Sequence, residues 1–247
     1  MTSIRSLNRI LLKSDLRDVT TLIATFLIPA ALLIALVRAF GDSAPDPSMD
    51  YVSQIATNVI AFGVAYAGIF AGAIHLATWR ENGMFRVLRA FPISTGMILT
   101  SQALVGAALM FLQVIIVFLL ALTPWVGMKP QTLAPLGLIP LFLGYLLFYF
   151  VGVLLAIIFP SIAAVSMLSN LIILPLGFIG GAILPLEILP DWAAKLAHYT
   201  PIYHLREALF KPVLNLGSWQ NAGLGCLYLA GVTLALYLIT RKTFTWK

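Results

Sequence analysis

Charged residues are scarce in this sequence of 247 residues. They make up 10% of it, whereas hydrophobic residues make up 61%. A soluble domain ordinarily carries about a quarter charged residues. The composition therefore argues against an ordinary soluble domain, and it indicates that most of the chain lies in a lipid bilayer.

Several motifs of enzymes and metal proteins are absent as well. The single cysteine, Cys226, cannot form an internal disulfide or a pair of C-x-x-C motifs. There is no H-E-x-x-H motif, and His75, His198 and His204 are scattered, so we interpret them as structural or interfacial. There is also no G-x-x-x-x-G-K-[ST] phosphate loop. We expect no catalytic residue, metal or cofactor on this chain.

Long apolar runs account for most of the sequence. Each is long enough to cross a hydrocarbon core of about 30 Å as a helix. The first is too long for the apolar core of a signal peptide, so we interpret it as a retained span. The prediction is one all-α integral membrane domain over residues 1–247 with six spans, at about 19–39, 52–78, 95–123, 133–159, 162–184 and 219–240.

Lysine and arginine concentrate on one side of this predicted topology. They precede the first span, lie between the second and third spans, and follow the last span, and the net charge is +6. The positive-inside rule therefore predicts cytoplasmic termini in a plasma-membrane protein and explains the charge without a nucleic-acid partner. The spans lack mid-membrane charges, which argues against an ion-coupled carrier. The energy for transport must then come from elsewhere, unless the protein is a passive pore.

Residues 1–18 form the predicted interfacial helix. Basic residues recur there every four positions, at Arg5, Arg9, Lys13 and Arg17, while leucines fall on another face. Such a helix suits the cytoplasmic membrane surface, with its cations on anionic headgroups of membrane lipids. An ordinary solvated helix before a span is the alternative.

The loop at 79–94 combines exposed aromatic and basic residues. Phe85, Leu88 and Phe91 recur at helical spacing beside Arg86 and Arg89, and Pro92 ends the pattern. This combination favours docking on a partner protein. A basic loop that only sets topology is the alternative.

Residues 185–212 are too polar to span the bilayer. Prolines at 185, 190 and 201 break helices in this segment, and Trp192 and Tyr199 lie between them. Interfacial aromatics beside such breaks predict short re-entrant helices in the outer leaflet.

These segments together resemble the ABC-2 family of exporter permeases. The family pattern after the second span is matched by Glu81, Gly83, Leu88 and Pro92. The pattern around the end of the fifth span and the segment that follows is matched by Gly181, Pro185, Pro190, Trp192, Pro201 and Arg206. The order of elements resembles the family over essentially the whole chain.

The resemblance implies a type V exporter-like arrangement. Two permeases would pair with two ATP-binding cassette proteins, which carry ATP and magnesium, and would move an amphipathic drug, lipid or lipid-linked substrate outward. The 79–94 loop would be the coupling element, with Glu81, Gly83, Phe85, Arg86, Leu88, Arg89, Phe91 and Pro92 on the cassette. Pro185, Glu187, Pro190, Trp192, Tyr199, Pro201 and Arg206 would form an outer gate.

Small and polar residues line one face of the second span and one face of the fifth. Each face contains a G-x-x-x-G pattern, which permits close helix packing. Pairing with the second permease subunit, lining of a substrate path and packing within one subunit all remain open. The residues of these faces are Asn58, Ala65, Gly68, Gly72, Ser166, Ser169, Asn170, Gly177 and Gly181.

Two other function classes remain open at this stage. An intramembrane lipid-modifying enzyme would need Glu187, Asp191, His198, His204 and Glu207 to converge. The other class is a membrane scaffold without transport activity.

Overall fold

The computed structural model describes residues 2–17, 19–41, 50–84, 94–184, 186 and 189–243. Within these ranges the regular structure is helical and there are no strands. The prediction of an all-α protein is confirmed. The helices are α1 (Thr2–Asp15), α2 (Val19–Phe40), α3 (Tyr51–Glu81), α5 (Thr95–Ala121), the short η1 (Ala134–Gly137), α6 (Leu138–Ile158), α7 (Ile162–Ile179), α8 (Asp191–Ala197), α9 (Pro201–Leu214) and α10 (Trp219–Thr243).

Five helical segments in the described ranges are long and apolar enough to cross a bilayer. They are α3, α5, η1 with α6, α7 and α10. The α2 helix has 22 residues, but the apolar stretch recognised within its described part, Thr25–Phe40, is shorter. The multi-span membrane fold is therefore confirmed, and the sixth span stays a prediction.

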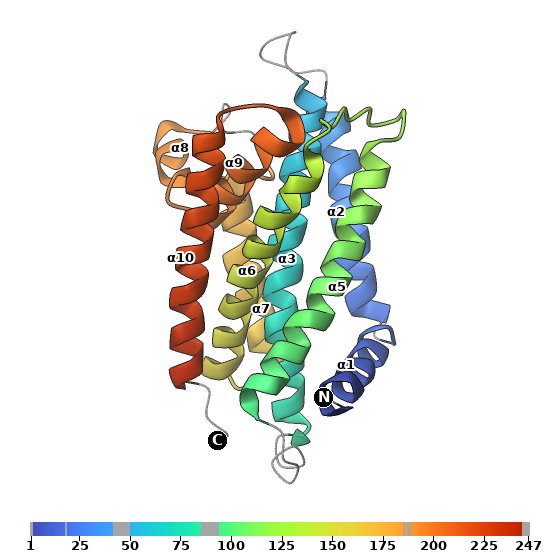
Figure 1. Ribbon diagram of the computed structural model, residues 1–247, viewed down its shortest axis with the longest axis vertical. Coiled ribbons are helices and arrows are strands. Elements are labelled where there is room, and N and C mark those ends of the chain that lie inside the picture. The colour runs from blue at the N-terminus through green and yellow to red at the C-terminus, as the bar shows by residue number, and fades with distance from the viewer. Residues whose placement is uncertain are drawn as a thin grey trace.

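The α3 helix lies at the centre of the bundle, in contact with α2, α5, α6, α7 and α9 (Figure 1). Most of its residues are buried, and 78% of its most apolar window lies inside the protein. A helix that is apolar around its whole circumference is stable in such a position because every face meets another helix or lipid. Movement of α3 must therefore displace most of the helices that pack against it.

Glycines allow α3 and α6 to cross closely. A Cβ atom on Gly68 would lie 2.7 Å from the carbonyl oxygen of Tyr145, and one on Gly72 would lie 2.9 Å from the backbone nitrogen of Val153. From the other side, a Cβ atom on Gly152 would lie 2.9 Å from the nitrogen of Ala73. The two backbones touch where side chains would otherwise separate them.

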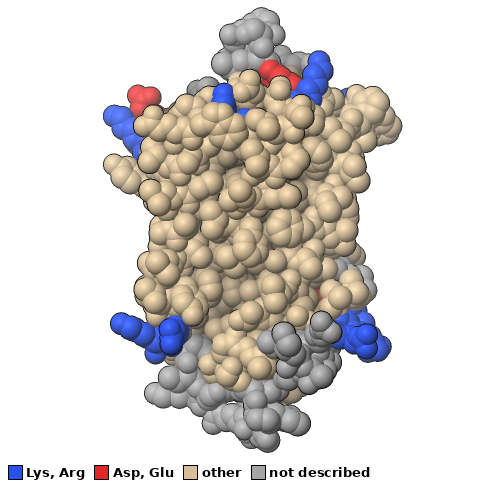
Figure 2. Space-filling model, in the orientation of Figure 1, with Lys and Arg blue, Asp and Glu red and all other residues tan. Residues whose placement is uncertain are grey.

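The charged residues gather at the two ends of the bundle. Figure 2 shows Lys and Arg near both ends of this face and Asp and Glu mainly at its upper end, with a largely uncharged band between them. The start of α1 and the end of α10 lie at one end, called here the α1 end, and α8 and α9 lie at the other, the α9 end (Figure 1). The uncharged band fits the hydrocarbon core of a bilayer. Which end faces the cytoplasm stays a prediction.

Two helices occupy much of the segment predicted to be re-entrant. Thr200 caps the start of α9, because its Oγ1 accepts a hydrogen bond from the backbone N–H of Tyr203 at 3.3 Å, and Pro201 is the first residue of the helix. Proline is well suited to this position because its missing N–H would have no partner inside the helix. Insertion of α8 and α9 into the outer leaflet stays a prediction.

Candidate functional site at the α1 end of the bundle

Arg80 fastens the end of α3 to the end of α6. Its guanidinium donates hydrogen bonds to the carbonyl oxygen of Phe159 at 2.9 Å and to that of Ile157 at 3.4 Å. The last carbonyls of a helix lack partners within the helix and carry partial negative charge. A cation from α3 therefore satisfies the end of α6. The sequence interpretation did not single out Arg80.

Glu81 makes the complementary contact with the next helix. Its Oε1 accepts a hydrogen bond from the backbone N–H of Ile162, the first residue of α7, at 2.7 Å. The first N–H groups of a helix carry partial positive charge, so a carboxylate is stabilised there. The end of α3 is thus joined to both helices that meet at the α6–α7 turn.

The chain changes direction immediately after these contacts. Gly83 has a φ of 65°, a left-handed conformation that glycine adopts without steric cost. The chain is described again from Ser94, whose side chain caps α5 by accepting the N–H of Met97 at 3.2 Å. The predicted docking residues Phe85, Arg86, Leu88, Arg89, Phe91 and Pro92 lie outside the described residues, so their role stays a prediction.

The α1 helix packs against the α5 side of this site. Leu7 and Leu11 are buried in a cluster with Ile98 and Val105 of α5, beside Trp79. The side chains of Arg9, Lys13 and Arg17 are exposed, and that of Arg5 lies outside the described residues. The apolar face of this amphipathic helix is therefore occupied by protein. Contact of its cations with lipid stays a prediction.

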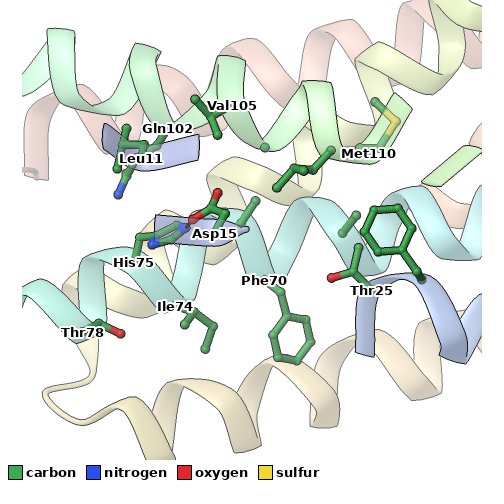
Figure 3. A pocket seen from close by; sticks show the side chains of 15 residues that line it. Leu11, Asp15, Thr25, Phe70, Ile74, His75, Thr78, Gln102, Val105 and Met110 are labelled. Atoms are coloured by element: carbon green, nitrogen blue, oxygen red, sulfur yellow. Dashed lines mark ion pairs between the residues drawn. The ribbon is translucent and has the colours of Figure 1, made fainter. Parts of the chain in front are cut away.

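A polar pair, with a buried carboxylate and a half-buried imidazole, joins α1 to α3. His75 Nε2 lies 2.7 Å from Asp15 Oδ1, and only 8% of the Asp15 side chain is exposed. Figure 3 shows the two side chains pointing toward each other at the wall of a cavity between α1, α2, α3 and α5. The pair anchors α1 to the central helix α3, because separating it would leave a buried carboxylate alone.

The same cavity contains a second polar group. The amide of Gln102 on α5 is 2% exposed, and neither its oxygen nor its nitrogen has a hydrogen-bond partner among the described residues. The cavity has a volume of about 130 Å³ and is otherwise lined largely by apolar side chains such as Phe70 and Met110 (Figure 3). A cavity of this size can hold several water molecules, at about 30 Å³ each, and water next to its few polar groups would satisfy the Gln102 amide.

The small-residue faces lie largely inside the chain. Gly68 and Gly72 meet α6, as described above, and a Cβ atom on Gly177 would lie 2.6 Å from the Phe62 ring of α3. Ala65, Asn58 and Ser169 are also buried, while Ser166 and Asn170 are half-buried. Packing within one subunit, one of the three alternatives, is thus what the structure shows for these glycines.

At the α9 end, the side chain of Arg206 packs against Gly181. Its side chain is 7% exposed and its guanidinium carbon lies 4.9 Å from the centre of the Phe210 ring. Gly181, with a φ of 76°, contacts the guanidinium at a place where a Cβ atom would clash. The structure brings together these two predicted gate residues, which are 25 positions apart.

The remaining predicted gate residues are more dispersed. Trp192 and Tyr199 are 66% and 78% exposed, and Pro190 is exposed at the start of α8. Pro201 is half-buried at the start of α9, and Pro185 and Glu187 lie outside the described residues. Exposed aromatics at this end suit a membrane interface.

Two residues of the enzyme alternative, His198 and His204, lie in an aromatic cluster, and Glu187 lies outside the described residues. His204 stacks on Tyr228, with ring centres 3.9 Å apart, and His198 lies 4.5 Å from the Tyr203 ring. Burial lowers the pKa of His204 below its usual 6.5. In the described ranges, no group of three or more His, Cys, Asp and Glu side chains is placed to hold a metal ion. The arrangement is that of packed side chains around α9 and α10.

Comparisons with known proteins identify the family. The chain is similar over residues 2–214 to the family described as "ABC-2 type transporter". It is 23% identical over 234 residues to the protein named "Putative transport permease YvfS" from Bacillus subtilis (strain 168), with 94% of each chain covered. Together with the bundle of membrane-spanning helices, the match favours a transport permease over a lipid-modifying enzyme. The chain belongs to the ABC-2 type transporter family.

Proposed function

We propose that this chain is the permease subunit of an ATP-driven exporter. Two permeases, identical or different, would work with two ATP-binding cassette proteins and move an amphipathic drug, lipid or lipid-linked substrate outward. Family membership supports the general role of a permease that associates with such a cassette. The cassette would carry the ATP and magnesium, because this sequence has no phosphate loop.

One observation carries this proposal: the double contact at the end of α3. Arg80 and Glu81 lie at the start of the predicted 79–94 coupling loop and hold the α6–α7 turn. The residues predicted to dock on the cassette through apolar contacts, Phe85 and Leu88, follow a few positions later. A cassette that displaces the loop would pull on α3, and the two contacts would transfer that displacement to α6 and α7. The loop would transmit force and would not itself catalyse any reaction.

The loop itself would dock through its apolar side chains. Phe85 and Leu88 would fill a groove on the cassette, while Arg86 and Arg89 would meet carboxylates at its rim. Truncation of a central aromatic commonly costs about 2 kcal/mol, and rim charges cost less. Phe85→Ala should therefore weaken cassette binding strongly. Arg89→Ala should have a smaller effect on cassette binding, and that effect should shrink further at high salt.

The transmission step can be tested without knowing the substrate. In a Cys226→Ser background, a reporter cysteine at Met167, an exposed position on α7, is labelled in the complex with its cassette, with and without ATP. ATP should change the labelling rate of the parent protein. Glu81→Ala should abolish that change while cassette binding stays intact, because the Glu81 carboxylate accepts a hydrogen bond from Ile162 and the apolar docking residues Phe85 and Leu88 are unaltered. Asp191→Ala, which removes an exposed carboxylate at the α9 end, is the matched control.

Two results would refute the proposal. The first is an ATP-dependent change in labelling that persists undiminished in Glu81→Ala, which would show that the contact transmits nothing. The second is the absence of any association with a cassette protein encoded beside this chain. That result would leave a scaffold as the better interpretation.

A further inference from the structure

The cavity between α1, α2, α3 and α5 has the size of a small organic molecule. Its volume is about 130 Å³. A cavity of about 150 Å³ in another protein binds benzene. A molecule of about six non-hydrogen atoms therefore fits inside, whereas a whole lipid or a drug-sized molecule does not.

Asp15 gives the wall of this cavity a negative charge. The residue lines the cavity and is 6% exposed. The described side chains that share the wall include no Lys or Arg, and the neighbouring cations of α1, Arg9 and Lys13, are exposed. His75 lies 2.7 Å from Asp15, but an imidazole is positive only when it is protonated. With a neutral His75 the buried carboxylate has no counterion on the wall, and a cation in the cavity would be stabilised.

Gln102 is an independent sign that the cavity takes a polar ligand. It lines the cavity, it is 2% exposed, and neither of its amide atoms has a hydrogen-bond partner among the described residues. A buried amide without partners is costly, so a ligand that bonds to it would be stabilised. Figure 3 shows Gln102, Asp15 and His75 toward one end of the cavity and Met110 toward the other. The cavity therefore has a polar end and an apolar remainder.

We propose that this cavity binds a small primary amine in its ammonium form, carrying a short apolar group. The ammonium donates hydrogen bonds to the Asp15 carboxylate and to the carbonyl oxygen of the Gln102 amide. The apolar group packs against Phe70 and Met110. A primary ammonium has three donors and no acceptor, which matches two acceptor groups at the polar end. Bonds between such a cation and a carboxylate are among the stronger hydrogen bonds in proteins.

Other small ligands match the cavity less well. An anion would be repelled by Asp15, and a neutral alcohol would leave its charge uncompensated. In the described ranges, no group of three or more His, Cys, Asp and Glu side chains is placed to hold a metal ion. The inference is independent of the exporter function, because it needs only the cavity and its polar end.

The test compares three molecules that share one ring. They are cyclohexylamine, which is protonated at neutral pH, the neutral cyclohexanol and the anionic cyclohexanecarboxylate. The full chain, together with its cassette protein where it forms that complex, is placed in nanodiscs of phosphatidylcholine. Binding is titrated by saturation-transfer difference NMR, and the signal of empty nanodiscs is subtracted. A second set of nanodiscs contains phosphatidylethanolamine, whose headgroup is also a primary ammonium.

The expected result is saturable binding of cyclohexylamine and at least about tenfold weaker binding of the other two molecules. Asp15→Asn should weaken cyclohexylamine binding about tenfold, whereas Asp191→Asn, which alters an exposed carboxylate at the α9 end, should leave it unchanged. Gln102→Met keeps the length of the side chain and the pair of Asp15 with His75. It should weaken binding about fivefold without lowering stability, because it removes a buried amide that lacks a partner.

Three outcomes would overturn the inference. Equal binding of cyclohexylamine and cyclohexanol would show that the cavity does not select a cation. Unchanged affinity in both Asp15→Asn and Gln102→Met would place the amine outside the cavity. Full competition by phosphatidylethanolamine would identify a site for a lipid headgroup in place of a site for a small free amine.

Discussion

Gly72→Ala tests the close crossing of α3 and α6. The new methyl carbon would lie 2.9 Å from the nitrogen of Val153 and closer still to the carbonyl of Tyr149. These neighbours are backbone atoms, so the helices themselves must separate. Overpacking of this kind costs about 1–3 kcal/mol. Alanine is also favoured over glycine within a helix by about 1 kcal/mol, which offsets part of this cost.

Gly231→Ala is the matched control for that substitution. Gly231 lies within α10, and a Cβ atom there would meet none of the described residues within 4 Å. Both substitutions carry the same helix-propensity gain, so the difference between them isolates the crossing. Gly72→Ala should be about 1–3 kcal/mol less stable than Gly231→Ala. The free energy of unfolding is measured by detergent titration of the purified chain, followed by tryptophan fluorescence.

A double substitution sharpens the test. Gly152→Ala presses on the same crossing from α6 and should cost a similar amount on its own. One separation of the helices relieves both clashes, so the double variant should lose less stability than the sum of the single variants. The close crossing would be refuted if Gly72→Ala and Gly152→Ala were both as stable as Gly231→Ala.

Three further predictions concern the two ends of the bundle. Asp15→Ala should release α1 from the bundle, because it removes the partner of His75. Backbone hydrogen exchange of residues 2–17 should then become faster, and unchanged exchange would contradict the anchoring role. His204 has a pKa lowered chiefly by burial, so the unfolded chain binds its proton more readily. Stability should therefore fall as the pH drops below about 6.5 toward the lower folded pKa, and His204→Gln should remove this part of the pH dependence. Gly181→Ala should destabilise the α9 end, because its φ of 76° is strained for alanine and the methyl group would clash with Arg206; a thermal melting temperature equal to that of the parent would count against this contact.

Much of the architecture could be predicted because apolar length and small residues are local signals. The runs at 52–78 and 219–240 predicted spans, and α3 and α10 occupy those regions. The G-x-x-x-G of Gly68 and Gly72 predicted a close helix contact, but a stripe of small residues does not name its partner. Only the structure identified that partner as α6 of the same chain.

Contacts between distant segments were not predictable in the same way. Asp15 lies in a helix whose charged residues are mostly basic. Its position on the buried Leu7–Leu11 face was therefore not recognised from the sequence. Its spacing of four from Leu11 was a usable signal, as was the polar Gln102 within an apolar span. The role of Arg80 depends on carbonyls nearly eighty positions away, and no sequence pattern reports free carbonyls at a helix end.

The adjacent contacts of Arg80 and Glu81 also restrict how α3 can move. Successive residues on a helix point about 100° apart, so the two side chains hold the α6–α7 turn from different directions. A single contact would act as a pivot and would let α3 spin about its own axis. Two contacts in different directions resist that spin, because rotation that relaxes one would stretch the other. If a cassette pushes on the end of α3 as proposed, these two contacts would make α6 and α7 tilt with it, and twisting of α3 alone would be suppressed.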